Sequence, residues 1–259
     1  MLVDICLALL SVALILWLAS MWYINDFSVP RKHLEHVKEA LVIFPHADDE
    51  TNIAGLLWLL KQGRVAVTFV VLTRGENGTP DAHKDLHLKT VRANEVQRVA
   101  RRLGAGQLIQ EDFGDGQLNT QKAELRRYID KLLQTQQPDL VITYDKAGLY
   151  GHEDHITCSE ITTELLANYP KTQLWYSVWP KHLLRTAHLP THMAKDPAFE
   201  SKRGVPNARI FIGRGVFAKI ASVYSHTSQR RSFRSMMPMH VPIWLLYSLQ
   251  IFEYYERVD

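Results

Sequence analysis

The stretch ALVIFPHADDE, residues 40–50, sets the expected fold of this chain. Its first part, Ala40–Phe44, is a short apolar run of the kind that forms a buried β-strand. Ionisable side chains follow directly, from His46 to Glu50, where the strand ends and a helix is expected to begin. Charged groups beside a buried strand are unfavourable unless they are paired or used in chemistry. The stretch therefore predicts a strand that ends at a functional site.

Short apolar runs and longer helical patterns alternate along the rest of the chain. The predicted strands are Ala40–Phe44, Val65–Leu72, Gln107–Gln110, Asp139–Tyr144, Leu174–Val178 and Arg209–Ile212. The predicted helices are Glu50–Gln62, Leu86–Leu103, Thr120–Gln136 and Glu153–Asn168. This alternation is typical of an α/β fold, so we expect a Rossmann-like, mostly parallel sheet with helices on both faces.

An uncharged apolar stretch, Ile5–Ile24, precedes this pattern. About 20 such residues suffice to cross the hydrocarbon core of a bilayer, and Trp22 and Tyr23 suit the lipid–water interface. A cleaved signal peptide is the alternative. It would need basic residues before the apolar run, where the only charged side chain is Asp4. We therefore expect residues 1–24 to form a retained transmembrane anchor.

Basic residues occur on one side of this stretch only, at Arg31, Lys32 and Lys38. The positive-inside rule then places the remaining chain on the cytoplasmic face of a single-pass protein. The membrane would be the inner membrane of a bacterium or the endoplasmic reticulum of a eukaryote. Residues 25–39 form a polar linker in this interpretation, and residues 40–259 form the α/β domain.

A second apolar stretch, residues 236–252, lies near the C-terminus, directly after the basic sequence QRRSFR of Gln229–Arg234. It contains Pro238 and Pro242, which makes a spanning helix unfavourable. Two interpretations stay open. The stretch forms a helix packed on the α/β domain, or it rests on the bilayer with the arginines against lipid headgroups.

Composition excludes some classes of function. The formal net charge is only +3, from 30 basic and 27 acidic residues, so we expect no nucleic-acid partner. The cysteines, Cys6 and Cys158, are too few for a cysteine zinc cluster. A metal site would therefore have to use histidine and carboxylate groups.

A second polar cluster, YGHEDH at residues 150–155, comes after the fourth predicted strand. Groups that follow the carboxyl ends of parallel strands meet at one edge of the sheet. Two histidines and one carboxylate form a common catalytic zinc site. Only three of His46, Asp49, His152 and His155 would then be ligands, which leaves one histidine free for acid or electrophile chemistry. The acidic residues of the first cluster are equally typical of a capped helix start.

Together these motifs resemble the PIG-L/LmbE-like zinc-dependent N-deacetylases, which remove acetyl groups from N-acetylglucosamine (GlcNAc) conjugates. The matching motifs, in family order, are His46-Ala47-Asp48-Asp49-Glu50, Thr73-Arg74-Gly75-Glu76, Arg92-x-x-Glu95, Asp115-Gly116 and His152-x-x-His155. Ala47 departs from the family pattern, which usually has proline there, and a loop without proline is less rigid. No motif anchors the resemblance after about residue 165.

The resemblance also implies what individual residues do. It implies that zinc, or another divalent ion such as Fe²⁺, is held by His46, Asp49 and His155. It implies that Asp48 is the general base on zinc-bound water. The groups that polarise the amide carbonyl would be Tyr150 and His152, with His152 oriented by Asp154. The substrate contacts would be Arg74, Arg92 and Asp115.

We therefore expect a membrane-anchored, zinc-dependent hydrolase that removes the N-acetyl group from a GlcNAc-containing glycolipid or glycoconjugate. Two other functions stay open. One is a metal-dependent amidase or sugar-conjugate hydrolase that cleaves a different bond. The other is a non-catalytic, membrane-tethered module that binds sugar.

Overall fold

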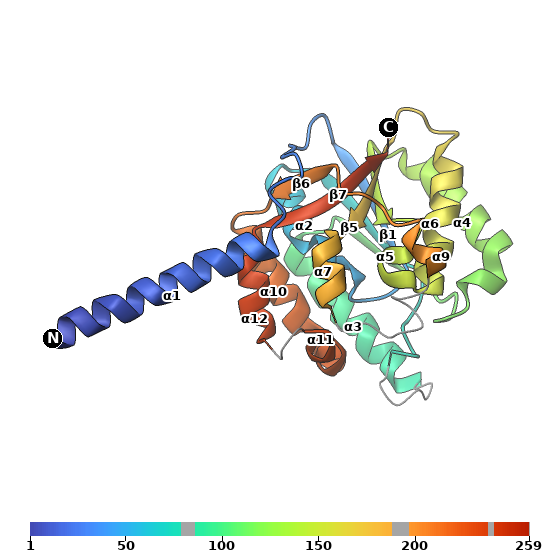
Figure 1. Cartoon of the computed structure of the whole chain (residues 1–259). Coiled ribbons are helices and arrows are strands. Elements are labelled where there is room, and N and C mark those ends of the chain that lie inside the picture. The colour runs from blue at the N-terminus through green and yellow to red at the C-terminus, as the bar shows by residue number, and fades with distance from the viewer. Residues whose placement is uncertain (79–85, 188–196, 238–240, 259) are drawn as a thin grey trace.

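A seven-stranded sheet forms the centre of the computed structural model, which describes residues 1–78, 86–187, 197–237 and 241–258 (Figure 1). Its strands, in the spatial order β3-β2-β1-β4-β5-β7-β6, are β1 (Glu39–Phe44), β2 (Ala66–Val71), β3 (Gln107–Gln110), β4 (Leu140–Tyr144), β5 (Gln173–Val178), β6 (Ala208–Phe211) and β7 (Phe252–Val258). Neighbouring strands are parallel except that β7 is antiparallel to both β5 and β6. The predicted α/β class with a mostly parallel sheet is confirmed, and β7 is the strand that the sequence analysis missed.

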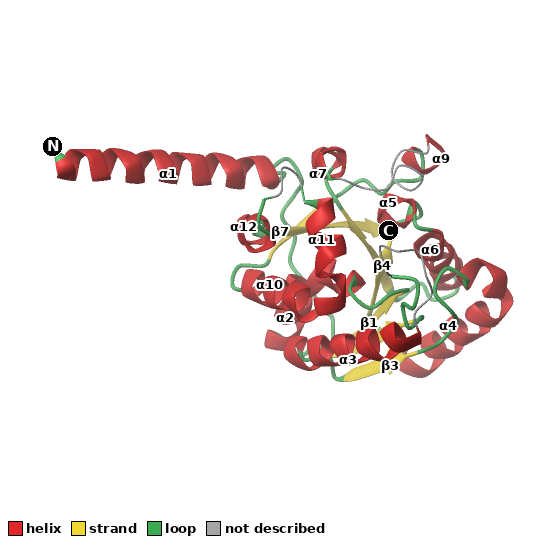
Figure 2. Cartoon of the chain, turned by 90° about the horizontal axis from the view of Figure 1, so that it is seen from below, coloured by secondary structure: helices red, strands yellow, loops and turns green. Residues whose placement is uncertain are grey.

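Helices cover both faces of the sheet (Figure 2). The α-helices are α1 (Leu2–Ile24), α2 (Ala54–Gln62), α3 (Leu86–Leu103), α4 (Lys122–Gln136), α5 (Gly148–Gly151), α6 (Glu153–Leu166), α7 (Lys181–Thr186), α9 (Pro197–Glu200), α10 (Gly215–Ser225), α11 (Arg230–Met236) and α12 (Ile243–Leu249). The 3₁₀ helices are η1 (Asp49–Ile53), η2 (Leu118–Gln121) and η3 (Thr227–Gln229).

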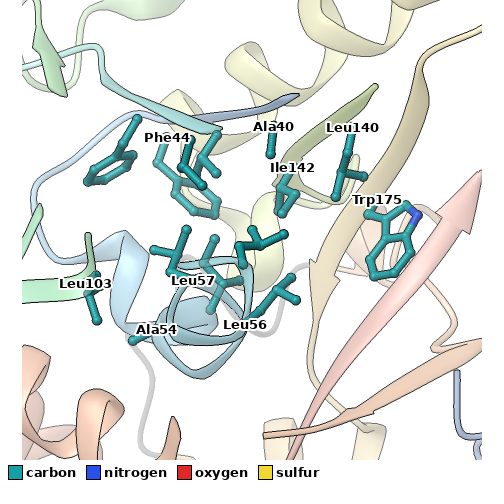
Figure 3. Packing of buried hydrophobic residues seen from close by; sticks show 14 of the residues in the cluster. Ala40, Phe44, Ala54, Leu56, Leu57, Leu103, Leu140, Ile142 and Trp175 are labelled. Atoms are coloured by element: carbon teal, nitrogen blue, oxygen red, sulfur yellow. The ribbon is translucent and has the colours of Figure 1, made fainter. Parts of the chain in front are cut away.

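The alternation of side chains along β1 explains these two layers. Val42 and Phe44 point into a core shared with α2 and α3, which Figure 3 shows around Phe44, Leu56 and Leu57. Leu41 and Ile43 point into the opposite core, shared with α4 and α6. Because both faces are covered, the strand is apolar at every position rather than at alternate ones.

Helix α1 projects away from the domain, and its 18-residue apolar window is 0% buried (Figure 1). By length and composition, Val3–Ile24 could cross a membrane. The end of the helix is fixed to the domain by Asn25. Its side-chain Nδ2 donates to the carbonyl of Leu249 at 2.7 Å, and its Oδ1 accepts the backbone N–H of Phe252 at 3.2 Å.

The segment that follows α1 runs along the edge strand β6. The backbone N–H of Arg209 donates to the carbonyl of Pro30 at 2.9 Å, and Lys32 donates back to Arg209 at 3.0 Å. Val29 is buried in the core on the α4 and α6 side. Much of the segment expected to be a linker is therefore bound to the sheet.

The C-terminal apolar stretch, residues 236–252, is divided between the end of α11, the whole of α12 and the start of β7. Residues 238–240 of it lie outside the described part of the chain. Helix α12 packs on α10 through Ile243 and Tyr247, which share a small core with Val223. Trp244 points outward and is 52% exposed.

Candidate active site

The candidate site lies at the carboxyl ends of β1 and β4, two neighbouring parallel strands. From β1 the chain continues to β2 on one side, and from β4 it continues to β5 on the other. Such a reversal of strand order opens a crevice where α/β proteins bind ligands. The structure brings both predicted clusters to this point. The residues after β1 are His46, Asp48 and Asp49, and those after β4 are Tyr150, His152, Asp154 and His155.

Three buried side chains converge at the centre of the site. Nδ1 of His46 lies 3.1 Å from Nε2 of His155 and 3.6 Å from Oδ2 of Asp49, and Oδ1 of Asp49 lies 3.3 Å from Nε2 of His155. A tetrahedral zinc ion with bonds of about 2.1 Å would hold its ligand atoms about 3.4 Å apart. The separations and the nitrogen and oxygen donors fit a small divalent ion of this kind.

Two further groups of possible ligand atoms overlap with this one at His46. The atoms of His46, His152 and His155 lie within 4.8 Å of one another, as do those of His46, Asp115 and Asp154. The hydrogen bonds of each side chain distinguish the groups. Asp115 and Asp154 contact Nε2 of His46, on the opposite side of the ring from Asp49 and His155.

The rings and carboxylate at the centre are held by neighbouring groups. Nδ1 of His155 faces the carbonyl of Gly148 at 3.3 Å, which leaves Nε2 directed at His46 and Asp49. The hydroxyl of Tyr144 donates to Oδ1 of Asp49 at 3.1 Å. Such outer contacts fix the orientation and tautomer of metal-binding side chains.

Asp154 orients His46 in this structure, whereas the sequence analysis expected it to orient His152. Its Oδ2 accepts from Nε2 of His46 at 3.1 Å and from the backbone N–H of Gly116 at 2.7 Å. The backbone N–H of Asp154 donates to Nδ1 of His152 at 3.2 Å. Burial alone would raise the pKa of Asp154, but the hydrogen bond and charge of His46 lower it.

Asp115, which the sequence analysis expected to bind substrate, also contacts His46. Its Oδ1 lies 3.1 Å from Nε2 of His46, and its Oδ2 accepts the backbone N–H of Asn77 at 3.0 Å. The side chain is buried, and the charge of His46 outweighs burial and lowers the pKa of its carboxyl group. Its contacts therefore join the loops that follow β2 and β3 to His46.

Asp48 lies beside the central group but contacts a different partner. Its Oδ1 forms an ion pair with Nη2 of Arg92 at 3.1 Å, and its side chain is 22% exposed. Burial raises the pKa of Asp48 to about 6, and the charge of Arg92 opposes that rise. The residue adopts φ = 106°, a left-handed conformation that is unfavourable for residues other than glycine. The carboxylate at this turn therefore lies next to the central group and pairs with Arg92.

Arg92 is only 3% exposed, although the sequence analysis expected it to contact substrate. Besides Asp48, its guanidinium donates to the carbonyls of Gly75, at 3.0 Å, and Ala47. Gly75 has φ = 70°, and a Cβ atom there would lie 2.6 Å from the guanidinium. The Thr-x-Gly-Glu motif thus provides the space that Arg92 occupies. The third expected substrate residue, Arg74, is partly exposed and donates to the carbonyl of Gln110 at 3.3 Å.

Two neutral hydrogen-bond donors complete the site. Burial raises the pKa of the Tyr150 hydroxyl well above its ordinary value, so the group stays protonated. Burial, followed by the charges of His46 and His155, lowers the pKa of His152 to about 3. Because Nδ1 of His152 accepts a backbone hydrogen bond, the ring proton is assigned to Nε2.

The sequence analysis missed the partners of two motif glutamates, which connect the site to the C-terminal region. Oε1 of Glu50 contacts Nε2 of His226 at 2.6 Å, and both side chains are fully buried. Glu95 accepts from the hydroxyls of Thr227 and Ser228, each at 2.6 Å. Both glutamates belong to motifs that the sequence analysis recognised. No pattern in the sequence identified residues 226–228 as their partners.

A cavity of about 100 Å³ opens beside Asp49, the first residue of η1, and Asp48, which precedes it. Tyr150 and Trp179 are among its lining residues. Residues of α7, α11 and α12, which are mainly apolar, also line the cavity. The residues from α11 and α12 belong to the C-terminal segments 229–234 and 236–252, which the sequence analysis singled out without assigning them to the site.

Comparison with known proteins agrees with this geometry. The family model described as PIG-L, GlcNAc-PI de-N-acetylase, matches residues 41–166. A probable N-acetyl-α-D-glucosaminyl L-malate deacetylase 2 of Bacillus anthracis is 30% identical over 205 residues, which cover 76% of this chain and 83% of the relative.

Solved structures show the same fold. The N,N′-diacetylchitobiose deacetylase of Pyrococcus horikoshii has a TM-score of 0.61 and 20% identity, covering 86% of this chain and 84% of that one. GalB of Pseudomonas putida KT2440, a 4-carboxy-2-hydroxymuconate hydratase, has a TM-score of 0.63 and 18% identity. The match covers 86% of this chain and 96% of GalB. The fold alone therefore does not specify deacetylation. The match in sequence is more specific, and it shows that the chain belongs to the PIG-L family, whose curated relatives here are deacetylases.

Proposed function

We propose that this protein is a zinc-dependent hydrolase that removes the N-acetyl group from a GlcNAc-bearing lipid or conjugate. One observation carries the proposal. The buried side chains of His46, Asp49 and His155 contact one another pairwise through possible ligand atoms at 3.1–3.6 Å, and Asp48 lies beside them with a different partner. This arrangement separates the groups that would bind metal from the group that would move a proton.

We assign the metal to His46, Asp49 and His155 rather than to the two overlapping groups. Asp115 and Asp154 occupy the other nitrogen of His46, and Nδ1 of His152 accepts a backbone hydrogen bond. Zinc, when bound there, would act as a Lewis acid that polarises the amide carbonyl and makes water nucleophilic near neutral pH.

The remaining steps use the protein's own side chains. Asp48 takes a proton from the attacking water and delivers it to the leaving nitrogen as the C–N bond breaks, so that acetate and a free amine are released. Arg92 holds the Asp48 carboxylate in place. Nε2–H of His152 and the hydroxyl of Tyr150 donate to the oxygen that becomes negative. Loss of one such donor typically lowers kcat by about 10²–10³.

The proposed substrate is an acetamido sugar, because the curated relatives are named for such substrates. The Bacillus anthracis relative is named for a GlcNAc-malate conjugate, and a 27% identical relative from Thermococcus kodakarensis is named for diacetylchitobiose. Arg74, which is partly exposed, is our candidate for contact with the sugar. We give Arg92 and Asp115 positioning roles, since both are buried and bound to the protein.

We also propose that α1 is a retained membrane anchor with the domain on the cytoplasmic face. The apolar helix is exposed up to the point where Tyr23 packs on His182 of α7, with ring centroids 5.8 Å apart. Asn25 then joins the helix to the buried backbone of Leu249 and Phe252. The full-length mass of the purified protein tests retention, because a cleaved signal peptide would shorten it. Protease protection in vesicles of known orientation tests the topology.

The full chain, purified in detergent and loaded with zinc, should release acetate from GlcNAc conjugates. His46→Ala and Asp49→Asn should lose both the metal, measured by elemental analysis, and acetate release. Asp48→Asn should keep the metal and lower kcat by about 10²–10⁴. Glu153→Gln, at an exposed neighbour of Asp154, is the matched control.

Three results would each contradict the proposal. Unchanged metal content and turnover in His46→Ala would exclude the metal site. Products without acetate would identify an amidase or hydrolase of another bond. Sugar binding without turnover by the zinc-loaded protein would identify a binding module.

A further inference from the structure

Two chemically different sets of side chains line the cavity beside the active site. The first set, which we call the inner end because it belongs to the candidate active site, comprises Asp48, Asp49 and Tyr150. The second set, which we call the outer end, consists mainly of hydrocarbon and aromatic side chains, from α7 (Leu183), α11 (Phe233, Met236) and α12 (Leu246, Tyr247). A sugar ring would leave its hydroxyl groups without partners at this outer end, which is unfavourable. The outer end therefore suits an apolar group attached to the sugar.

Two of the helices that form the outer end, α7 and α12, also contact the end of α1. The ring of Tyr23, in the last turn of α1, packs on His182, the neighbour of the cavity residue Leu183. Asn25, directly after α1, donates to the carbonyl of Leu249 at the end of α12. The apolar cavity thus lies next to the point where the proposed anchor enters the domain.

Exposed aromatic side chains surround this junction. Trp22 of α1 is 71% exposed, Phe27 after it is 41% exposed, and Trp244 of α12 is 52% exposed. Tryptophan and other aromatic residues concentrate where a protein meets the lipid–water interface. With α1 in the bilayer, the mouth of the cavity would lie close to the membrane surface.

Building on the proposed function, we propose that this cavity binds the hydrocarbon chain of a membrane-embedded GlcNAc lipid, at the part of the chain nearest the sugar. The acetamido group would then face the inner end, at Asp48 and Asp49. Sites that enclose a whole drug-sized ligand measure about 300–1,000 Å³, and this cavity measures about 100 Å³. Only a short part of the chain would leave the bilayer, and the rest would stay in the membrane.

Two neighbouring leucines of α7 provide a matched test, because both are partly buried and only Leu183 lines the cavity. We would compare the octyl and methyl glycosides of GlcNAc, both anomers of each, with the full-length zinc-loaded protein in nanodiscs. In the unmodified protein, kcat/KM should be at least roughly tenfold higher for the octyl compound.

Leu183→Gln should lower the ratio of octyl to methyl kcat/KM by roughly tenfold, because it introduces an unpaired amide into the apolar end. Leu184→Gln should leave the ratio unchanged. Leu246→Gln and Leu245→Gln form a second pair on α12, of which only Leu246 lines the cavity. If the ratio of octyl to methyl kcat/KM fell equally in both variants of each pair, or fell in neither variant, the proposal would be overturned.

Photolabelling adds a measurement that does not depend on turnover. An alkyl GlcNAc glycoside with a diazirine on the carbon nearest the sugar should label residues of α7, α11 or α12, as located by mass spectrometry. Labelling confined to α1 or to residues outside these helices would overturn the proposal.

The same experiments separate this inference from the proposed function. Failure to release acetate from every glycoside would contradict the deacetylase itself. Equal turnover of the octyl and methyl compounds would leave the deacetylase intact and remove the lipid site.

Discussion

Nδ1 of His46 lies 3.1 Å from Nε2 of His155, although 109 residues separate them in the chain. The two residues follow β1 and β4, which are hydrogen-bonded neighbours in the sheet. Asp154, next to His155 in sequence, reaches across to the other nitrogen of His46 at 3.1 Å. The pairing of two strands therefore places both histidines and an orienting carboxylate around one point.

Asp154→Asn should weaken metal binding about 10–100-fold, because the amide is a poorer acceptor for Nε2–H of His46. Competition with a chelator of known affinity would measure the change. Glu153→Gln should bind metal as tightly as the unmodified protein. Equal affinities in all three proteins would show that Asp154 does not support the ligand.

Gly75→Ala should lower both stability and kcat. A residue with a side chain at φ = 70° costs roughly 1–2 kcal/mol, and its Cβ would lie 2.6 Å from the Arg92 guanidinium. Arg92 would have to move away from Asp48. Gly63→Ala is the control, because Gly63 has φ = −76° and its Cβ would make only ordinary contacts of 3.5 Å or more. Urea denaturation would measure the loss of stability, and steady-state kinetics would measure the fall in kcat. Equal stability and equal kcat for Gly75→Ala and Gly63→Ala would contradict the prediction.

The hydrogen bonds of Glu95 should make stability depend on pH. Burial opposes ionisation, but the hydroxyls of Ser228 and Thr227 outweigh it and lower the pKa of Glu95. A carboxylate with a lowered pKa stabilises the fold fully above its ordinary pKa of about 4.3, and this stabilisation disappears as the pH falls through the folded value.

Glu95→Gln should therefore be less stable than the unmodified protein at pH 7, and the difference should shrink below about pH 4. Urea denaturation of both proteins at each pH would measure it, and comparing the pair removes effects that they share. A difference that stays constant with pH would show that the charge of Glu95 contributes nothing.

Glu253→Leu should destabilise the domain by about 3–5 kcal/mol, because it leaves a buried lysine unpaired. Oε1 of Glu253 lies 3.1 Å from Nζ of Lys219, and both side chains are at most 5% exposed. Its carboxylate also accepts the backbone N–H groups of Gly55 and Leu56 at the start of α2, each at 2.9 Å. Adding Lys219→Met should restore part of the loss in urea denaturation. A double variant less stable than Glu253→Leu alone would contradict the pairing.

The sequence by itself determined the mostly parallel part of the sheet, because short apolar runs such as Ala40–Phe44, alternating with helical patterns, favour strands covered on both faces. It also showed that polar groups follow β1 and β4, whose carboxyl ends meet in any parallel sheet. The predicted site clusters therefore lie together as expected. These conclusions depend on local pattern and on one general rule of α/β folds.

Only the tertiary structure decided which partner each polar group takes. Asp154 orients His46 instead of His152, Arg92 holds Asp48, and Glu50 contacts His226, a residue 176 positions away. Strand β7 and the apolar wall of the cavity also appear only in the fold. Hydrogen bonds act over about 3 Å, so their partners depend on packing between distant segments rather than on any local pattern in the sequence.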